Sequence, residues 1–118
     1  MSYQVIPTPR FLADVEFYRV KKKYRKIDED ITEVVTALEN GLLLGDEITG
    51  LKLPENESSY KVRVANTSAK VGKSGGFRLI YYVIRDDCEI YLLTIYSKKD
   101  LENITNDEIV ELIKTYCA

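Results

Sequence analysis

Six basic side chains and no acidic one lie between residues 58 and 85. Residues 60–64 alternate in polarity, so strand geometry places Lys61 and Arg63 on one face and Val62 and Val64 on the other. Like charges held this close together are unfavourable unless an anion lies against them. The block therefore indicates an anion-binding face of a sheet, and the alternative is that the basic residues decorate a solvated face. Its basic residues are Lys61, Arg63, Lys70, Lys73, Arg78 and Arg85.

The chain contains no histidine. Catalysis through a Ser-His-Asp or Cys-His group and zinc binding through imidazole are therefore excluded. The two cysteines, Cys88 and Cys117, have no CxxC spacing and are too few for a cysteine-only zinc site. We expect two reduced thiols in a cytosolic protein, and we expect neither a metal nor a cofactor.

The 118 residues carry a net charge of −2 and have a pI near 5.2, which by itself argues against nucleic-acid binding. The charge is segregated, however, into −3 over residues 1–57, +6 over residues 58–85 and −5 over residues 86–118. Residues 19–26 add a second run of six basic side chains without an acid. That run can be a helix C-terminus, where the helix dipole favours cations, or part of a binding surface.

Gly72-Lys73-Ser74 resembles the end of a nucleotide-binding P-loop. The P-loop pattern also needs a glycine five positions earlier, where Thr67 stands, and a helix afterwards, where Gly75-Gly76 and a predicted strand stand. We therefore exclude nucleotide hydrolysis. The glycine pair can be a flexible entry to the strand, or it can let the backbone and Lys73 approach a phosphate closely.

Three helices are predicted around this block. The first follows a short strand over residues 4–7, begins at the N-cap Thr8 with Pro9 in its first turn, and runs into residues 19–26. The second is capped by Asp28 and ends at Asn40-Gly41, and the last is capped by Thr105 or Asn106. The apolar positions expected to face the core are Phe11, Leu12, Val15, Tyr18, Ile31, Val34, Val35, Leu38, Ile109, Leu112 and Ile113.

The predicted longer strands cover residues 60–64, 77–84 and 89–97, with a loop over residues 45–59 and a hairpin turn over residues 85–88. The order β-α-α-β-β-β-α indicates an α+β fold, a single domain over residues 1–118 with helices on one face of an antiparallel-rich sheet. The longest apolar run, residues 79–84, is too short to span a membrane, and residues 1–10 lack the apolar core of a signal peptide. We expect a soluble cytoplasmic protein.

Three segments carry a resemblance to a known family. They are Tyr60-Lys-Val-Arg-Val64, Lys73-Ser-Gly-Gly-Phe-Arg-Leu-Ile-Tyr-Tyr-Val83 and Ile90-Tyr-Leu-Leu-Thr-Ile-Tyr-Ser-Lys98. Together they closely resemble the RelE/HigB toxins of type II toxin–antitoxin systems, in particular the HigB-like branch. The similarity is strongest over residues 60–99, whereas residues 9–50 match only in having two helices before the sheet. The resemblance implies a RelE-like fold, with a curved antiparallel-rich sheet packed against helices.

The resemblance also implies a function. Such toxins enter the ribosomal A site, cleave mRNA as metal-independent endoribonucleases, inhibit translation, and are neutralised by a cognate antitoxin protein. Family members often have an arginine where Lys99 stands, and some carry a C-terminal tyrosine, for which Tyr96 and Tyr116 are the candidates. The catalytic residues expected by position are Lys61, Arg63, Arg78, Lys98 and Lys99, and the RNA-binding residues expected are Lys70, Lys73 and Tyr96.

These residue types suit RNA cleavage by the RNA's own 2′-hydroxyl, which needs a proton acceptor, stabilisation of the phosphorane and stabilisation of the 5′-oxygen. We expect Arg78 to clamp the phosphate and the first-strand basic pair to act as base or stabilisers. The basic pair at the end of the last strand would act as acid or phosphate contact, the loop lysines would position phosphates, and Tyr96 would stack on a base. Such a site should be slow on free RNA and depend on the ribosome for orientation.

Two other functions stay open at this point. A ParE-like toxin of the same superfamily would act on another target, such as DNA gyrase, and the complete basic set favours the nuclease over it. A small RNA- or protein-binding module without catalysis is the third possibility, and the sequence does not separate it from the nuclease.

Overall fold

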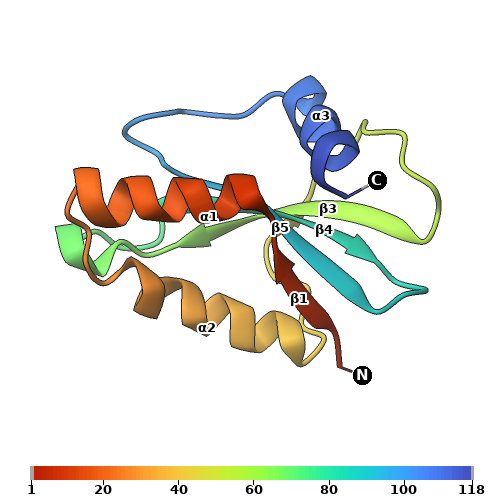
Figure 1. The fold of residues 1–118 in the computed structure, drawn as a ribbon, viewed down its shortest axis with the longest axis horizontal. Helices are drawn as coiled ribbons and strands as arrows, with labels where there is room; N and C mark the ends of the chain where they lie inside the picture. The colour runs from red at the N-terminus through yellow and green to blue at the C-terminus, as the bar shows by residue number, and fades with distance from the viewer. Residues whose placement is uncertain (1, 118) are drawn as a thin grey trace.

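A five-stranded sheet with the order β1-β5-β4-β3-β2 forms the centre of the computed structural model, which describes residues 2–117 (Figure 1). The N-terminal strand β1 lies parallel to β5, and the other neighbouring strands are antiparallel. The elements in chain order are β1 (Gln4–Pro7), α1 (Pro9–Glu16), a π-helical turn η1 (Phe17–Lys21), α2 (Ile27–Glu39), β2 (Asp46–Glu47), β3 (Glu57–Val64), a short 3-10 helix η2 (Thr67–Ala69), β4 (Phe77–Ile84), β5 (Glu89–Ser97) and α3 (Asn106–Tyr116).

The two hairpin strands β4 and β5 match the sequence prediction, and β3 does not. It begins at Glu57 instead of Tyr60, because Ser58 and Ser59 are buried and the Ser59 hydroxyl donates a hydrogen bond to the Tyr81 carbonyl at 2.7 Å. The region predicted as a loop also contains the short strand β2, which pairs with Tyr60 and Lys61. These polar residues adopt strand conformation because the neighbouring strands satisfy their hydrogen bonds, and an alternating pattern in the sequence does not reveal this pairing.

Helices cover both faces of the sheet, so the prediction that they lie on one face is wrong. Helices α1 and α2 pack on the face that carries Val62 and Leu79, whereas α3 packs on the opposite face against Ile80 and Leu93. The physical reason is in β4, where every residue from Phe77 to Val83 is buried. A strand that is apolar on both faces needs cover on both.

Helix α1 begins as predicted, since the Thr8 hydroxyl accepts a hydrogen bond from the Phe11 amide at 3.2 Å and Pro9 occupies the first turn. Leu12 was expected in the core but is 54% exposed. Helix α2 is not capped by Asp28 as predicted. It starts at Ile27 with Lys26 at the N-cap, and the Asp28 carboxylate forms an ion pair with Arg19 at 3.1 Å.

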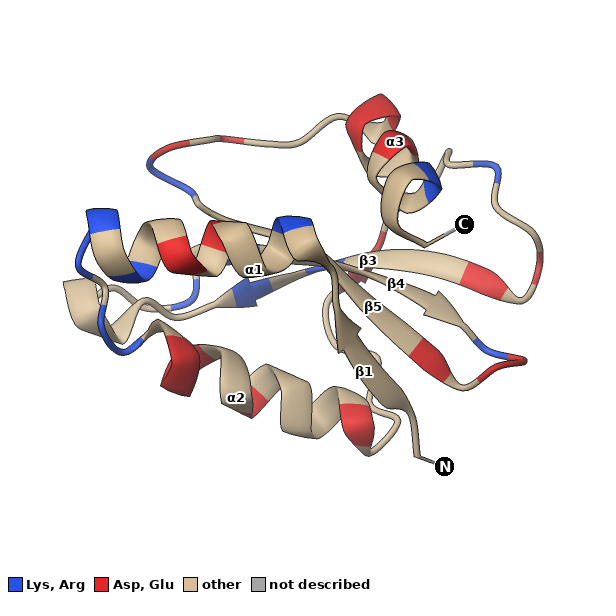
Figure 2. Ribbon diagram, viewed as in Figure 1, with Lys and Arg blue, Asp and Glu red and all other residues tan. Residues whose placement is uncertain are grey.

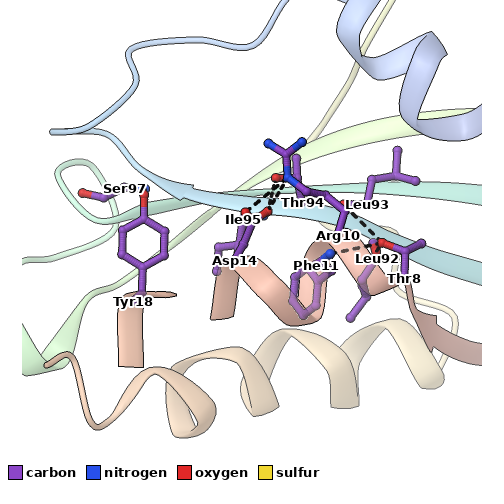
Figure 3. Close-up of polar contacts among 10 residues, drawn as sticks. All are labelled: Thr8, Arg10, Phe11, Asp14, Tyr18, Leu92, Leu93, Thr94, Ile95 and Ser97. Carbon is purple, nitrogen blue, oxygen red and sulfur yellow. Dashed lines mark hydrogen bonds and ion pairs between the residues drawn. The ribbon is translucent and has the colours of Figure 1, made fainter. Parts of the chain in front are cut away.

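Helix α1 seals the edge of β5 that β1 leaves open (Figure 3). Strand β1 pairs with β5 only as far as Leu92. Beyond that point, the Asp14 carboxylate accepts hydrogen bonds from the Thr94 hydroxyl and from the Ile95 amide, the latter at 3.3 Å. The Tyr18 hydroxyl accepts from the Ser97 amide at 2.8 Å. Side chains of one helix thus replace the missing neighbour strand.

Replacing Asp14 with alanine should lower the free energy of unfolding by about 1–3 kcal/mol, because the Ile95 amide and the Thr94 hydroxyl lose their acceptor. Urea unfolding followed by circular dichroism measures the change. Glu16→Ala, on the exposed side of the same helix, is the matched control and should change stability by less than about 0.5 kcal/mol. Equal losses in the two variants would contradict the edge-sealing role.

Alkaline pH should destabilise the protein through Tyr18. Burial raises the pKa of this hydroxyl from 10.0 to about 12, although the hydrogen bond from the Ser97 amide opposes the shift. Between pH 10 and 12 the unfolded state therefore loses a proton that the folded state keeps, so stability falls as pH rises through this window. Tyr18→Phe should lower stability at pH 7 and flatten the decline above pH 10, as followed by thermal melting. A decline as steep as that of the unmodified chain would refute this assignment.

Candidate functional site

The sheet register brings the predicted strand residues together. Arg63 on β3 lies opposite Arg78 on β4, and Arg78 lies opposite Tyr96 on β5. Lys61 lies opposite Ile80, which belongs to the core beneath α3. Residues directly opposite one another share a face, so Lys61, Arg63 and Arg78 all lie on the α3 side of the sheet, as the alternation predicted.

Arg78 is buried, with 7% of its surface exposed. Its Nη1 atom donates to the carbonyls of Lys73 and Phe77, both at 3.2 Å, and its Nη2 atom donates to the carbonyl of Ser74 at 2.9 Å. Three carbonyl oxygens therefore hold the guanidinium from one side, which fixes the end of the loop over residues 65–76. The clamp role predicted for Arg78 requires an open guanidinium, whereas here it anchors the loop that carries Lys73.

The glycine pair before β4 has a packing role that neither sequence interpretation included. A Cβ atom on Gly76 would lie 2.2 Å from the Val64 carbonyl oxygen, and one on Gly75 would lie 2.7 Å from the Val71 side chain. The Gly76 carbonyl also accepts a hydrogen bond from the Lys98 amide at 3.0 Å. Glycine is needed because backbone segments from three parts of the chain meet here without room for a side chain.

The other predicted residues surround this loop. The Lys98 ammonium lies 3.5 Å from the Ser74 carbonyl, and the Lys61 ammonium donates to the Asn103 amide oxygen at 3.1 Å. The side chains of Arg63, Lys73 and Lys99 are exposed. We call this group the basic corner; it consists of Lys61, Arg63, Lys73, Arg78, Lys98 and Lys99. Among residues 2–117, no acidic side chain forms an ion pair with any member.

A hollow of about 530 Å³ opens beside the basic corner. Lys61, Arg63 and Lys73 line one part of it, and α2 contributes Asp30 and Glu33 on the other. The Asp30 carboxylate already accepts hydrogen bonds from the Thr67 amide at 3.1 Å and the Thr67 hydroxyl at 2.8 Å. The charge of Asp30 is thus partly satisfied within the protein, whereas Glu33 and Asp46 also line the hollow opposite the cations from β3 and the loop. The volume lies in the range of ligand-binding clefts, roughly 300–1,000 Å³.

Tyr96 is placed differently from the expectation. It is 5% exposed and packs in the core beneath α3 with Ile104 and Ile109. Burial raises the pKa of its hydroxyl, while the positive charge of Arg78 lowers it. Within the described chain, the hydroxyl has no hydrogen bond of standard geometry. A ring buried in this way cannot stack on a base in this conformation. The sequence analysis expected helices on one face of the sheet only, and it therefore did not predict that α3 covers the face on which Tyr96 lies.

Lys70 does not line the hollow beside the basic corner. It follows η2 in the left-handed conformation, with a φ angle of 57°, and its side chain is exposed. The same part of the loop contacts the basic run over residues 19–26, because the Lys26 amide donates to the Ser68 hydroxyl at 2.8 Å. No local pattern in the sequence indicates this contact, which joins residues 42 positions apart.

The chemistry available at the corner is the binding of phosphate by arginine and lysine. Residues 2–117 contain no group of three or more cysteine or acidic side chains placed to hold a metal ion. In the same residues, every helix is too short or too polar to cross a lipid bilayer.

The fold and the corner together define an α+β protein with a RelE-like fold. No protein-family model matches the chain. A solved structure with a similar fold is that of the E. coli toxin RelE, a variant with two arginines replaced by alanine, in the free state. The two chains are 20% identical, the alignment covers 86% of this chain and 90% of that one, and the TM-score is 0.50. At this identity the likeness establishes the fold.

The packing role of Gly76 predicts a sharp contrast between two glycines of one loop. Gly76→Ala should lower the free energy of unfolding by about 1–3 kcal/mol, because its Cβ would overlap the Val64 carbonyl. Gly72→Ala, whose Cβ would have no atom within 4 Å, should change it by less than about 0.5 kcal/mol. Urea unfolding of both variants gives the comparison. Similar stabilities would rule out the close approach as the reason for glycine at position 76.

Proposed function

We propose that the protein is the toxin of a type II toxin–antitoxin system, of the HigB-like kind, and that it cleaves mRNA in the ribosomal A site. The observation that carries the proposal is the basic corner. Strand register and a buried arginine bring exposed cations from β3, the loop and the end of β5 to one place without ion pairs among residues 2–117. The RelE-like fold also supports the proposal.

In this proposal the exposed Arg63 binds the scissile phosphate and stabilises charge on the phosphorane, since arginine can grip two phosphate oxygens. Lys61, two residues earlier on the same face, takes the 2′-hydroxyl proton or stabilises the anion. Lys98 and Lys99 contact the phosphate or assist the 5′-oxygen as it leaves. Arg78 acts from beneath by holding the loop, so that Lys73 is presented to the RNA backbone.

The site lacks a group that transfers protons readily near neutral pH, because the chain has no histidine. The reaction therefore depends on orientation of the RNA, which the ribosome supplies by holding the mRNA codon. This makes the ribosome and its bound mRNA the working substrate in the cytoplasm, and free RNA a poor one. No metal and no organic cofactor take part in the proposed reaction.

A cognate antitoxin is the proposed protein partner. The unpaired cations of the basic corner favour an acidic partner. Helix α1 also exposes Leu12 beside an apolar hollow of about 230 Å³ between α1 and α2, lined by Val5, Val15 and Ile31 among others. Exposed apolar surface of this kind supports docking of another protein. Capture of a free monomer alone at native expression would count against the antitoxin.

The central experiment is inducible expression with mapping of mRNA 5′ ends. The unmodified chain should arrest growth and produce cuts positioned within codons. Arg63→Ala should reduce the cuts by about 100-fold, as expected when one group that stabilises the transition state is removed. Because Arg63 is exposed, this variant tests chemistry without disturbing the fold, whereas Arg78→Ala would also release the loop.

Lys52→Ala is the matched control, since Lys52 is exposed and lies in the loop before β3. It should cut like the unmodified chain. Growth arrest without cuts would refute the nuclease and favour a ParE-like toxin with another target. Absence of arrest would favour a non-catalytic binding module.

A further inference from the structure

The basic run over residues 19–26 forms a rigid, exposed surface at one end of the molecule. The helix of α1 widens into the π-helical turn η1, and Lys23 then takes a left-handed conformation with a φ angle of 59°. The Tyr24 amide donates to the Tyr18 carbonyl at 2.9 Å, and the rings of these two tyrosines stack with centroids 6.1 Å apart. Tyr24 also packs edge-on against Phe77. The segment is therefore held by the core and is not a frayed helix end.

All six basic side chains of this run are exposed: Arg19, Lys21, Lys22, Lys23, Arg25 and Lys26. Two of them are neutralised within the protein, since Arg19 pairs with Asp28 at 3.1 Å and Lys22 pairs with Asp100 at 3.4 Å. The remaining four form no ion pair with any residue between 2 and 117. A solvated helix end that only complements the helix dipole does not need so many unpaired cations.

Tertiary contacts join this surface to the basic corner. The Lys26 amide bonds to Ser68 in the loop that carries Lys70 and Lys73, and Lys22 bonds to Asp100 directly after Lys98 and Lys99. Figure 2 shows the result, with the basic segments of α1, the following turn, the loop before β4 and the turn after β5 gathered at the end of the molecule where α1 ends. A ligand that lies on the basic corner can extend onto residues 19–26.

We infer that residues 19–26 form a second RNA-binding surface, which binds the phosphate backbone of double-stranded RNA beside the strand held at the basic corner. The inference extends the proposed function, because it names the kind of RNA that docks next to the cut strand, but it does not require cleavage. Single-stranded RNA is bound through exposed aromatic rings, and duplex RNA through its shape and phosphates. The run offers cations, and its own aromatic side chain, Tyr24, is packed against Tyr18 and Phe77. The neighbouring Phe17 is about half exposed, with the Lys22 ammonium 6.0 Å from its ring centre.

An acidic protein is the competing occupant of this surface. The apolar hollow that would suit a protein lies between α1 and α2, beside β1, and of residues 19–26 it includes Arg19, which is already paired with Asp28. Continuity with a proposed RNA site therefore favours RNA. Phosphates repeat at short intervals along each strand of a duplex, so a duplex that docks on residues 19–26 presents several of them to the four unpaired cations.

The test measures binding of the purified chain to a fluorescent RNA hairpin with a stem of about 16 base pairs, over a range of salt concentrations and without ribosomes. Lys21→Gln combined with Lys23→Gln removes two unpaired cations from the surface. Lys52→Gln combined with Lys114→Gln removes the same charge from exposed positions in the loop before β3 and on α3. Thermal melting checks that both double variants are folded.

The first double variant should bind the hairpin about tenfold more weakly at low salt, and the slope of log affinity against log salt should be shallower by about 2. The control variant should bind like the unmodified chain. Equal binding by the two variants would overturn the inference. A second result would also overturn the inference: the first double variant binds polyglutamate more weakly than the unmodified chain does, but binds the hairpin equally well. That result would assign the surface to an acidic protein.

Failure of the inference and failure of the proposed function are separable. If the unmodified chain makes no cuts in cells but hairpin binding falls only in the first variant, the RNA surface stands and the nuclease does not. If cuts appear and depend on Arg63 while both double variants bind the hairpin equally, the nuclease stands and the RNA surface does not.

Discussion

The edge of β5 beyond Leu92 is the point on which the rest of the structure depends. A strand edge in the middle of a folded protein leaves amide groups without partners, and burying them unbonded is costly. Asp14 and Tyr18 supply the acceptors for Ile95 and Ser97. This fixes α1 across the sheet, and it holds the end of β5 in place, from which Lys98 and Lys99 follow directly.

The end of β5 is connected to the basic corner by backbone contacts. The Lys98 amide bonds to the Gly76 carbonyl, and Gly76 lies against the Val64 carbonyl where no side chain would fit. Arg78 then ties the preceding loop down through three carbonyls. A buried arginine in this arrangement stabilises a loop conformation and contributes positive charge from beneath, while the exposed residues Arg63 and Lys73 are left to meet a ligand.

Tertiary contacts also determine the distribution of charge over the whole surface. The net charge of −2 describes none of the surfaces, because the acids lie mainly on the helices and the end of the chain. The fold gathers residues 19–26, the end of β3, the loop before β4 and the turn after β5 at one end, whereas Arg85 lies at the opposite end of β4 beside Ser58. Local fields depend on which charges are neighbours in space, and a whole-chain pI does not report this.

The sequence by itself determined the features that depend on residues close together in the chain. These features are the cap at Thr8, the long strands β4 and β5, the shared face of Lys61 and Arg63, and the α+β class. Alternation and capping act between residues a few positions apart, so they can be seen in the sequence. The tertiary structure decided the burial of Arg78 and Tyr96, the cover of α3 on the second face, the need for glycine at position 76 and the meeting of residues 19–26 with Ser68. Each of these is a contact between segments far apart in the chain, and no local period encodes which distant backbone or side chain will occupy the neighbouring space.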